Sequence, residues 1–124
     1  MKLLLDAHVV LWWLQDNRQL RTEARRAIAR TDIVWVSTAT AMELALKASR
    51  KRLRLPEPLA ITIAMDGFTE LQLTVEHTER LATLPIHHGD PFDRVLVAQA
   101  QVEGATIVTH DRAFEQYGMP VIWT

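Results

Sequence analysis

The sequence of 124 residues contains no cysteine and no low-complexity tract. Without cysteine, the chain can form no disulfide framework, no thiolate metal site and no thiol nucleophile. No apolar run approaches the roughly 18 residues of a membrane-spanning helix. The few apolar residues that follow Met1 are also too short for the hydrophobic part of a signal peptide. These absences lead us to expect a cytoplasmic protein without a membrane segment.

The composition is typical of a globular protein, since hydrophobic residues make up 48% of the chain and charged residues 23%. A chain of this length can bury a core and usually forms one domain. We therefore expect a single domain that spans residues 1–124. The net charge is -1, which by itself speaks against a polyanionic partner.

Short apolar runs alternate with helix-forming segments along the whole chain. Strands are expected at residues 2–6, 33–37, 71–73, 106–109 and 121–123. Helices are expected at residues 9–15, 22–30, 38–52, 58–67, 78–83, 91–103 and 112–117, with a loop at 56–58. Asp90 and Pro91 should open one of these helices, and Gly104 should follow its end. The alternation predicts an α/β fold, with a mainly parallel central sheet flanked by helices on both faces.

Four acidic residues stand where apolar runs meet helices: Asp6, Glu43, Asp93 and Asp111. Because the carboxyl ends of parallel strands share one edge of the sheet, ligands gather there. Acids delivered to this edge from separate segments would form one negative pocket, which attracts a hard cation. With no cysteine and no firm histidine constellation, carboxylates suit Mg²⁺ or Mn²⁺ better than Zn²⁺.

Each acid also has a purely structural interpretation. Asp6 and Asp111 could cap the helical segments that follow them. Glu43 could complete a capping box that begins at Thr40, and Asp93 could favour the dipole at the start of its helix. Capping does not explain why the acids meet at one edge of the predicted sheet. Taken together, they favour a catalytic site.

Basic residues concentrate in two stretches, residues 18–30 and 47–54. If the four acids are set aside as metal ligands, fourteen bases face eleven acids, a balance of +3. Clustered bases beside a cation-filled pocket could hold a phosphate backbone. They could equally form solvated helix faces, and composition alone favours that second interpretation.

Three segments carry a family resemblance: residues 3–8 (LLLDAH), 37–47 (STATAMELALK) and 84–100, which includes GDPFDR and is followed by Thr109-His110-Asp111. In this order and spacing they resemble the PIN-domain family, specifically VapC-type toxin ribonucleases of bacterial toxin–antitoxin pairs. The resemblance covers nearly the whole chain. It implies a Mg²⁺- or Mn²⁺-dependent endoribonuclease that forms a homodimer and binds a cognate antitoxin.

The resemblance also implies roles for individual residues. Asp6, Glu43, Asp93 and Asp111 would form the acidic quartet of the family. Asp6 and Asp93 would be the best metal ligands, and Glu43 would bind the metal directly or through water. Ser37 and Thr109 would be hydroxyl groups that orient carboxylates or waters. His110 is a departure, because arginine often precedes this aspartate in relatives.

Other functions remain as alternatives. A PIN-like scaffold could bind RNA or protein without catalysis. Asp6-Ala7-His8 and the GDPFDR segment imitate blocks of calcineurin-like metallophosphoesterases, but their later Gly-Asn-His block is missing. A receiver domain would need an aspartate and a lysine where Thr74 and Thr124 follow strands.

The segment Val9–Leu14 is apolar on all sides. A helix of this kind buries more than one face. Trp12 and Trp13 are therefore expected either in the core or at a protein interface, where tryptophan is enriched. The sequence does not decide between these two environments.

Overall fold

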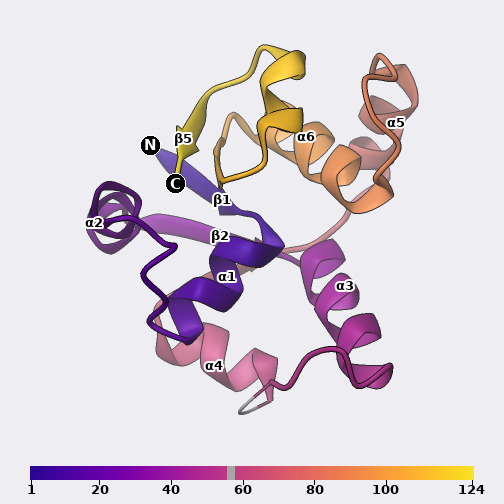
Figure 1. The fold of residues 1–124 in the computed structure, drawn as a ribbon. Coiled ribbons are helices and arrows are strands. Elements are labelled where there is room, and N and C mark those ends of the chain that lie inside the picture. Colours follow the sequence, from indigo (N-terminus) through magenta and orange to yellow (C-terminus); the bar gives the residue numbers. More distant parts are fainter. Residues whose placement is uncertain (56–57) are drawn as a thin grey trace.

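A five-stranded sheet forms the centre of the computed structural model, which describes residues 1–55 and 58–124 (Figure 1). The strand order is β3-β2-β1-β4-β5, and every neighbouring pair is parallel. The strands are β1 (Lys2–Leu5), β2 (Ile33–Ser37), β3 (Thr69–Leu71), β4 (Thr106–Thr109) and β5 (Val121–Trp123). The predicted α/β class is therefore confirmed, and the sheet is parallel throughout.

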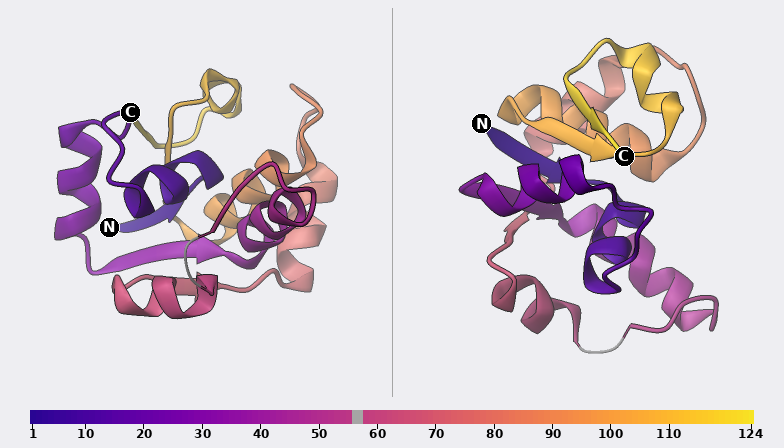
Figure 2. Two further views of the ribbon diagram at one scale, coloured as in Figure 1. Left: turned by 60° about the horizontal axis from the view of Figure 1, so that its bottom comes forward. Right: turned by 60° about the vertical axis from the view of Figure 1, so that its left-hand side comes forward.

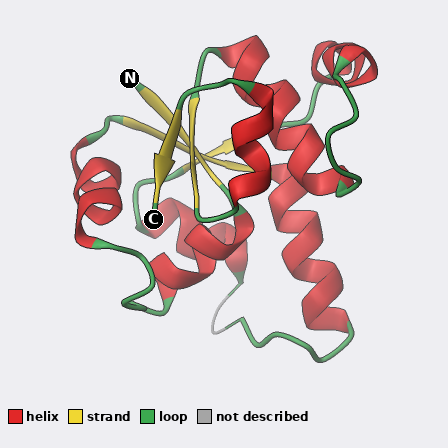
Figure 3. Cartoon of the chain, turned by 45° about the horizontal axis from the view of Figure 1, so that its top comes forward, coloured by secondary structure: helices red, strands yellow, loops and turns green. Residues whose placement is uncertain are grey.

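Helices connect the strands, as parallel pairing requires. In chain order they are α1 (Ala7–Leu14), α2 (Thr22–Arg30), α3 (Thr38–Ser49), α4 (Leu59–Met65), α5 (Val75–Thr83), α6 (Pro91–Glu103) and the 3-10 helix η1 (Arg112–Tyr117). Figure 3 shows the strands surrounded by these helices. None of the helices in the described ranges has the length and apolar character needed to cross a membrane.

Two apolar clusters cover the two faces of the sheet, because successive side chains of a strand point to opposite sides. Leu3 and Leu5 of β1 belong to a cluster with α1, α2 and α4, whereas Leu4 belongs to one with α6 and η1. Two further views show these helices on opposite sides of the sheet (Figure 2). Phe114 of η1 is fully buried in the second cluster. Helices thus flank both faces, as the sequence predicts.

Both tryptophans of α1 pack against the first cluster. Trp12 is a buried member of that cluster, and Trp13 is half-buried at its margin. The Trp13 ring lies 5.5 Å from that of Phe68, and its Nε1 donates a hydrogen bond of 3.2 Å to Asp66. Packing within the chain therefore explains both residues.

Several element boundaries differ from the predicted ones, and two of these differences have a clear structural cause. Strand β3 occupies residues 69–71 instead of 71–73, and Leu71 is buried while Leu73 is 42% exposed. Helix α1 begins at Ala7 instead of residue 9, because the Asp6 side chain caps it. The predicted loop at 56–58 includes residues 56–57, which lie outside the described ranges.

Helix α5 begins at Val75, three residues earlier than predicted, because of an unusual capping box. The Thr74 hydroxyl accepts a hydrogen bond from His77 N, and His77 Nδ1 accepts one from Thr74 N. Histidine here replaces the glutamate or glutamine that usually completes such a box. His77 is 1% exposed, and its Nε2 lies 2.7 Å from Glu103 Oε2 of α6. The box therefore also ties α5 to α6.

Gly104 ends α6 in the left-handed region, with φ 67°. Alanine at this position strains the backbone, so we expect Gly104→Ala to lower the free energy of unfolding by about 1 kcal/mol. Gly89→Ala is the matched control, because Gly89 lies outside the left-handed region and an added Cβ meets nothing within 4 Å at either position. Urea denaturation of both variants measures the difference. Equal stability of the two would contradict this account of the helix end.

Candidate active site

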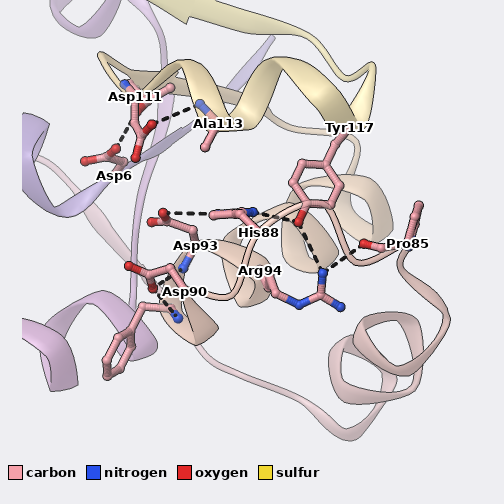
Figure 4. Close-up of polar contacts among 11 residues, drawn as sticks. Asp6, Pro85, His88, Asp90, Asp93, Arg94, Asp111, Ala113 and Tyr117 are labelled. Carbon is pink, nitrogen blue, oxygen red and sulfur yellow. Dashed lines mark hydrogen bonds and ion pairs between the residues drawn. The ribbon is translucent and has the colours of Figure 1, made fainter.

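The candidate residues gather at the carboxyl edge of the sheet. Asp6 directly follows β1, and Asp111 stands two residues beyond β4, the neighbour of β1. Asp93 comes from the first turn of α6. In Figure 4 the side chains of Asp6, Asp93 and Asp111 lie around one common space. The parallel topology therefore brings together acids that are far apart in the sequence.

Asp6 is held firmly at both carboxylate oxygens. Oδ1 accepts a hydrogen bond of 2.8 Å from His8 N, and Oδ2 accepts one from the hydroxyl of Thr109. Thr109 Oγ1 in turn accepts a hydrogen bond of 3.0 Å from Asp111 N. Asp6 and Thr109 are both buried. The Thr109 hydroxyl thus orients the Asp6 carboxylate, and Asp6 also caps α1.

Asp93 experiences the combined charge of the other acids. Its pKa is raised from 3.8 to about 7, first by burial and then by the negative charges of Asp90, Asp6, Asp111 and Glu43. The Asp93 side chain is 16% exposed. Because Coulomb repulsion weakens with distance, the contribution of all four neighbours indicates that they surround one region. Asp93 is therefore the focus of the negative charge.

Asp90 adds negative charge near Asp93, but its side chain serves as the cap of α6. Its Oδ1 accepts hydrogen bonds from Phe92 N at 2.9 Å and from Asp93 N at 3.2 Å. The predicted helix cap is confirmed, and Asp93 occupies the third position of α6. Asp111 caps η1 in the same way, by accepting a hydrogen bond of 2.9 Å from Ala113 N.

Glu43 does not belong to a capping box, so that interpretation is wrong. Helix α3 begins at Thr38, and its cap is Ser37, whose hydroxyl accepts a hydrogen bond of 3.1 Å from Ala39 N. Glu43 therefore lies well inside the helix, where it forms an ion pair of 3.1 Å with Lys47. The Ser37 hydroxyl contacts the backbone of α3 and not a carboxylate, so its proposed role toward water remains a prediction.

Sequence reasoning missed a chain of polar contacts behind Asp93 (Figure 4). His88 Nε2 lies 3.3 Å from Asp93 Oδ2, and His88 Nδ1 lies 2.8 Å from the hydroxyl of Tyr117. Arg94 donates hydrogen bonds to that hydroxyl at 3.2 Å and to Pro85 O at 2.8 Å. If Tyr117 donates to Nδ1, the remaining imidazole proton is on Nε2 and points at Asp93. The only signal in the sequence is the spacing of His88 and Asp93 around the helix cap.

The donor set fits a hard divalent cation. Asp6, Glu43, Asp93 and Asp111 offer carboxylate oxygens, which Mg²⁺ and Mn²⁺ prefer. Within residues 1–55 and 58–124, no three acidic or histidine side chains converge closely enough to form a metal-binding group. Mutual repulsion of carboxylates favours such separation when no cation screens them. Burial is the largest cause of the raised pKa of Asp93, and the negative charges of the neighbouring acids add to it; a bound cation would oppose both effects.

Comparisons with known proteins identify the family. Residues 3–119 match the family model of the PIN domain. Over 122 residues the chain is 31% identical to Ribonuclease VapC22 of Mycobacterium tuberculosis, and the match covers 94% of this chain and 92% of that protein. The chain belongs to the PIN-domain family. The predicted resemblance is confirmed, and the metallophosphoesterase and receiver alternatives are rejected.

Solved structures show the same fold. The VapBC2 complex of Rickettsia felis bound to a promoter DNA fragment contains a chain with a TM-score of 0.77 and 14% identity, with 98% of both chains covered. The DNA-bound VapBC complex of Salmonella typhimurium contains one with a TM-score of 0.70 and 19% identity, and the match covers 98% of this chain and 97% of that one.

The pKa of Asp93 makes the stability of the metal-free protein depend on pH. A carboxyl whose pKa is raised on folding contributes stability below its unfolded pKa, near 3.8, and this contribution is lost as pH rises through about 7. The full loss is at most about 4 kcal/mol. In EDTA, we expect Asp93→Asn to be more stable than the wild type at pH 8, with a difference that shrinks steadily as the pH falls and vanishes near the unfolded pKa of 3.8.

Urea denaturation across this pH range measures the effect as a difference between the two proteins. Asp32→Asn serves as the control, because Asp32 is exposed and lies before β2, at the opposite edge of the sheet. Its stability should follow the wild type at every pH. A constant difference between Asp93→Asn and the wild type would contradict the raised pKa.

Proposed function

We propose that this protein is a metal-dependent endoribonuclease, the toxin of a toxin–antitoxin pair, which acts in the cytoplasm. The observation that carries the proposal is the set of four acids around Asp93 at the carboxyl edge of the sheet. The sequence similarity to a ribonuclease over nearly the whole chain supports the same activity. The reaction is hydrolysis of an RNA phosphodiester bond.

In this proposal Asp6 and Asp93 hold a Mg²⁺ or Mn²⁺ ion, with Glu43 binding directly or through water. Such an ion lowers the pKa of a bound water and stabilises charge on the leaving oxygen. Thr109 fixes the orientation of the Asp6 carboxylate, and His88 contacts that of Asp93. Asp111 acts through water or on a second metal ion. No side-chain nucleophile is needed.

The basic stretch at residues 18–30 supports an RNA substrate. Arg18, Arg21 and Arg25 line a cavity of about 540 Å³. The backbone N of Arg21 donates a hydrogen bond of 2.8 Å to the hydroxyl of Thr124, whose own N donates one of 3.1 Å to Thr109 O. The cavity thus lies at the same edge as the acids, where it can receive the phosphate backbone. Arg25 also forms a 3.0 Å ion pair with Asp16.

Replacing the metal-binding carboxylates should abolish cleavage. We expect Asp6→Asn and Asp93→Asn to lower the rate of RNA cleavage in Mg²⁺ or Mn²⁺ by at least roughly 100-fold, because each loses a ligand charge. Asparagine preserves the cap at position 6. The measurement is gel analysis of structured and single-stranded RNAs, and EDTA should stop the wild-type reaction.

Asp32→Asn is again the control and should cleave like the wild type. Equal activity of all four proteins would overturn the site assignment. RNA binding without cleavage by the wild type would instead favour a non-catalytic PIN-like scaffold. Mapping RNA 5′ ends after induction of the protein without its antitoxin would identify the target.

We also propose that the protein forms a homodimer and binds an antitoxin. Two of the structural neighbours are chains of VapBC complexes. Another solved structure is described as a toxin–antitoxin complex from Klebsiella pneumoniae, with a TM-score of 0.66, 19% identity, and 98% of this chain and 96% of that one covered. An apolar groove of about 450 Å³ between α3 and α6 supports a protein partner. Met42 at its wall is 55% exposed, and Leu73 is 42% exposed.

Light scattering of the isolated protein tests the homodimer. Because exposed apolar side chains favour association, we expect twice the mass of one 14.2 kDa chain at micromolar concentration. Dilution should shift the mass toward that of one chain. A strictly monomeric mass at every concentration would contradict the homodimer but would leave the nuclease activity untouched.

A further inference from the structure

Two exposed imidazole rings lie beside the carboxylate site. His8 follows Asp6 by two residues, and His110 directly precedes Asp111. Their ring centroids are 4.8 Å apart, with an angle of 78° between the planes. Both residues are exposed, although they adjoin a buried part of the fold.

A buried tryptophan fixes the position of both rings. The His110 ring lies 4.8 Å from the ring of Trp12, and the His8 ring lies 5.8 Å from it. His8 and Trp12 are four residues apart in α1, so their side chains share one face of the helix. Trp12 is only 9% exposed. The buried Trp12 ring therefore supports the two exposed histidine rings.

The backbone determines which way each ring points. Thr109 directs its hydroxyl to Asp6, and alternation along the chain turns His110 away from it, toward α1. The backbone N of His8 is held by Asp6 Oδ1 at 2.8 Å. The rings thus lie against α1, on residues that adjoin Asp6 and Asp111 in the sequence.

Neither ring has a polar role within the protein. Among the described residues, the imidazoles of His8 and His110 make no hydrogen bond or ion pair, whereas those of His77 and His88 each make two or more. The contact between the two rings is edge-to-face, and both residues remain exposed. RNA-binding proteins stack unpaired bases on such rings, including histidine, without reading the base sequence.

We propose that His8 and His110 form a stacking surface that receives a nucleobase next to the phosphate held at the carboxylate site. This inference rests on the proposed ribonuclease function and adds its mode of substrate binding. The His110 ring, which packs against Trp12, stacks on an unpaired nucleobase. The preferred substrate region is therefore single-stranded. The surface positions RNA and takes no part in bond cleavage.

Fluorescence anisotropy with a fluorescein-labelled single-stranded RNA tests the proposal, in Mg²⁺ and with a non-hydrolysable backbone analogue to prevent cleavage. His110→Ala should raise the Kd by about five- to 100-fold, the range for loss of one stacked base. His110→Phe keeps a ring without charge and should bind within about twofold of the wild type. His110→Lys supplies a positive charge without a ring and should bind as weakly as His110→Ala.

A second probe isolates the base from the phosphates. An abasic ribose-phosphate chain of the same length should bind equally to the wild type and to His110→Ala, because it offers no base to stack. His87→Ala is the matched control: His87 is also exposed, and its ring packs against Tyr117 at 4.9 Å instead of against Trp12. It should bind RNA like the wild type. Circular dichroism confirms that each variant is folded, and His8→Ala provides an independent removal of the surface.

Three results would overturn the stacking surface. One is an unchanged Kd for both His110→Ala and His8→Ala. Another is tight binding by His110→Lys together with weak binding by His110→Phe, which would indicate a phosphate contact. The third is equal loss of affinity for the abasic chain. RNA cleavage by the wild type is measured separately, so a failed stacking surface is distinguishable from a failed ribonuclease function.

Discussion

The parallel pairing of β1 with β2 and β4 is the constraint on which the candidate site depends. Parallel strands must all end at one edge, so residues that follow them are neighbours in space whatever their separation in the sequence. The hydrogen bond between Thr109 and Asp6 joins positions 103 residues apart in this way. The central strand β1 is buried along residues 3–5, and this packing fixes the position of Asp6 at the end of the strand. Packing of the sheet therefore sets the geometry of the acids before any ligand is bound.

Gathering carboxylates at this edge is unfavourable for the free protein. Asp93 is largely removed from water and faces four other acids, and its raised pKa records both effects. Strongly perturbed carboxyl groups are more frequent at functional sites, where stability is given up for chemistry. The polar chain runs from Arg94 through Tyr117 to His88, and it places a donor at Asp93 when the Tyr117 hydroxyl donates to His88 Nδ1. The repulsion between these carboxylates thus destabilises the site locally, whereas the packing of the rest of the fold is favourable.

Most of the fold follows from patterns that are local in the sequence. Apolar runs and helix-forming segments predicted every strand and helix, and the acids were predicted at the shared edge. The misplaced features depend on side-chain contacts that a linear pattern does not contain. Asp6 extends α1 by capping it, and His77 completes a capping box in which glutamate or glutamine is expected.

The same limit applies to the site. The contact of His88 with Asp93 depends on how the loop before α6 folds back, and Tyr117 joins it from an element 29 residues from His88. Glu43 resembled a capping residue because Thr40 precedes it by three positions, but the helix starts earlier, at Thr38. Sequence thus identified the acids, whereas their supporting contacts required the structure.

Asp6 and Asp111 each serve as a helix cap as well as a candidate site residue. One oxygen of each carboxylate accepts a backbone N–H. Because each residue has both roles, a substitution that removes the candidate site function can also remove a helix cap and lower stability. Asparagine or serine can take over the cap, but an apolar residue cannot. Related proteins that have lost catalysis should therefore retain small polar residues at these two positions. The former site would then still be recognisable in their sequences.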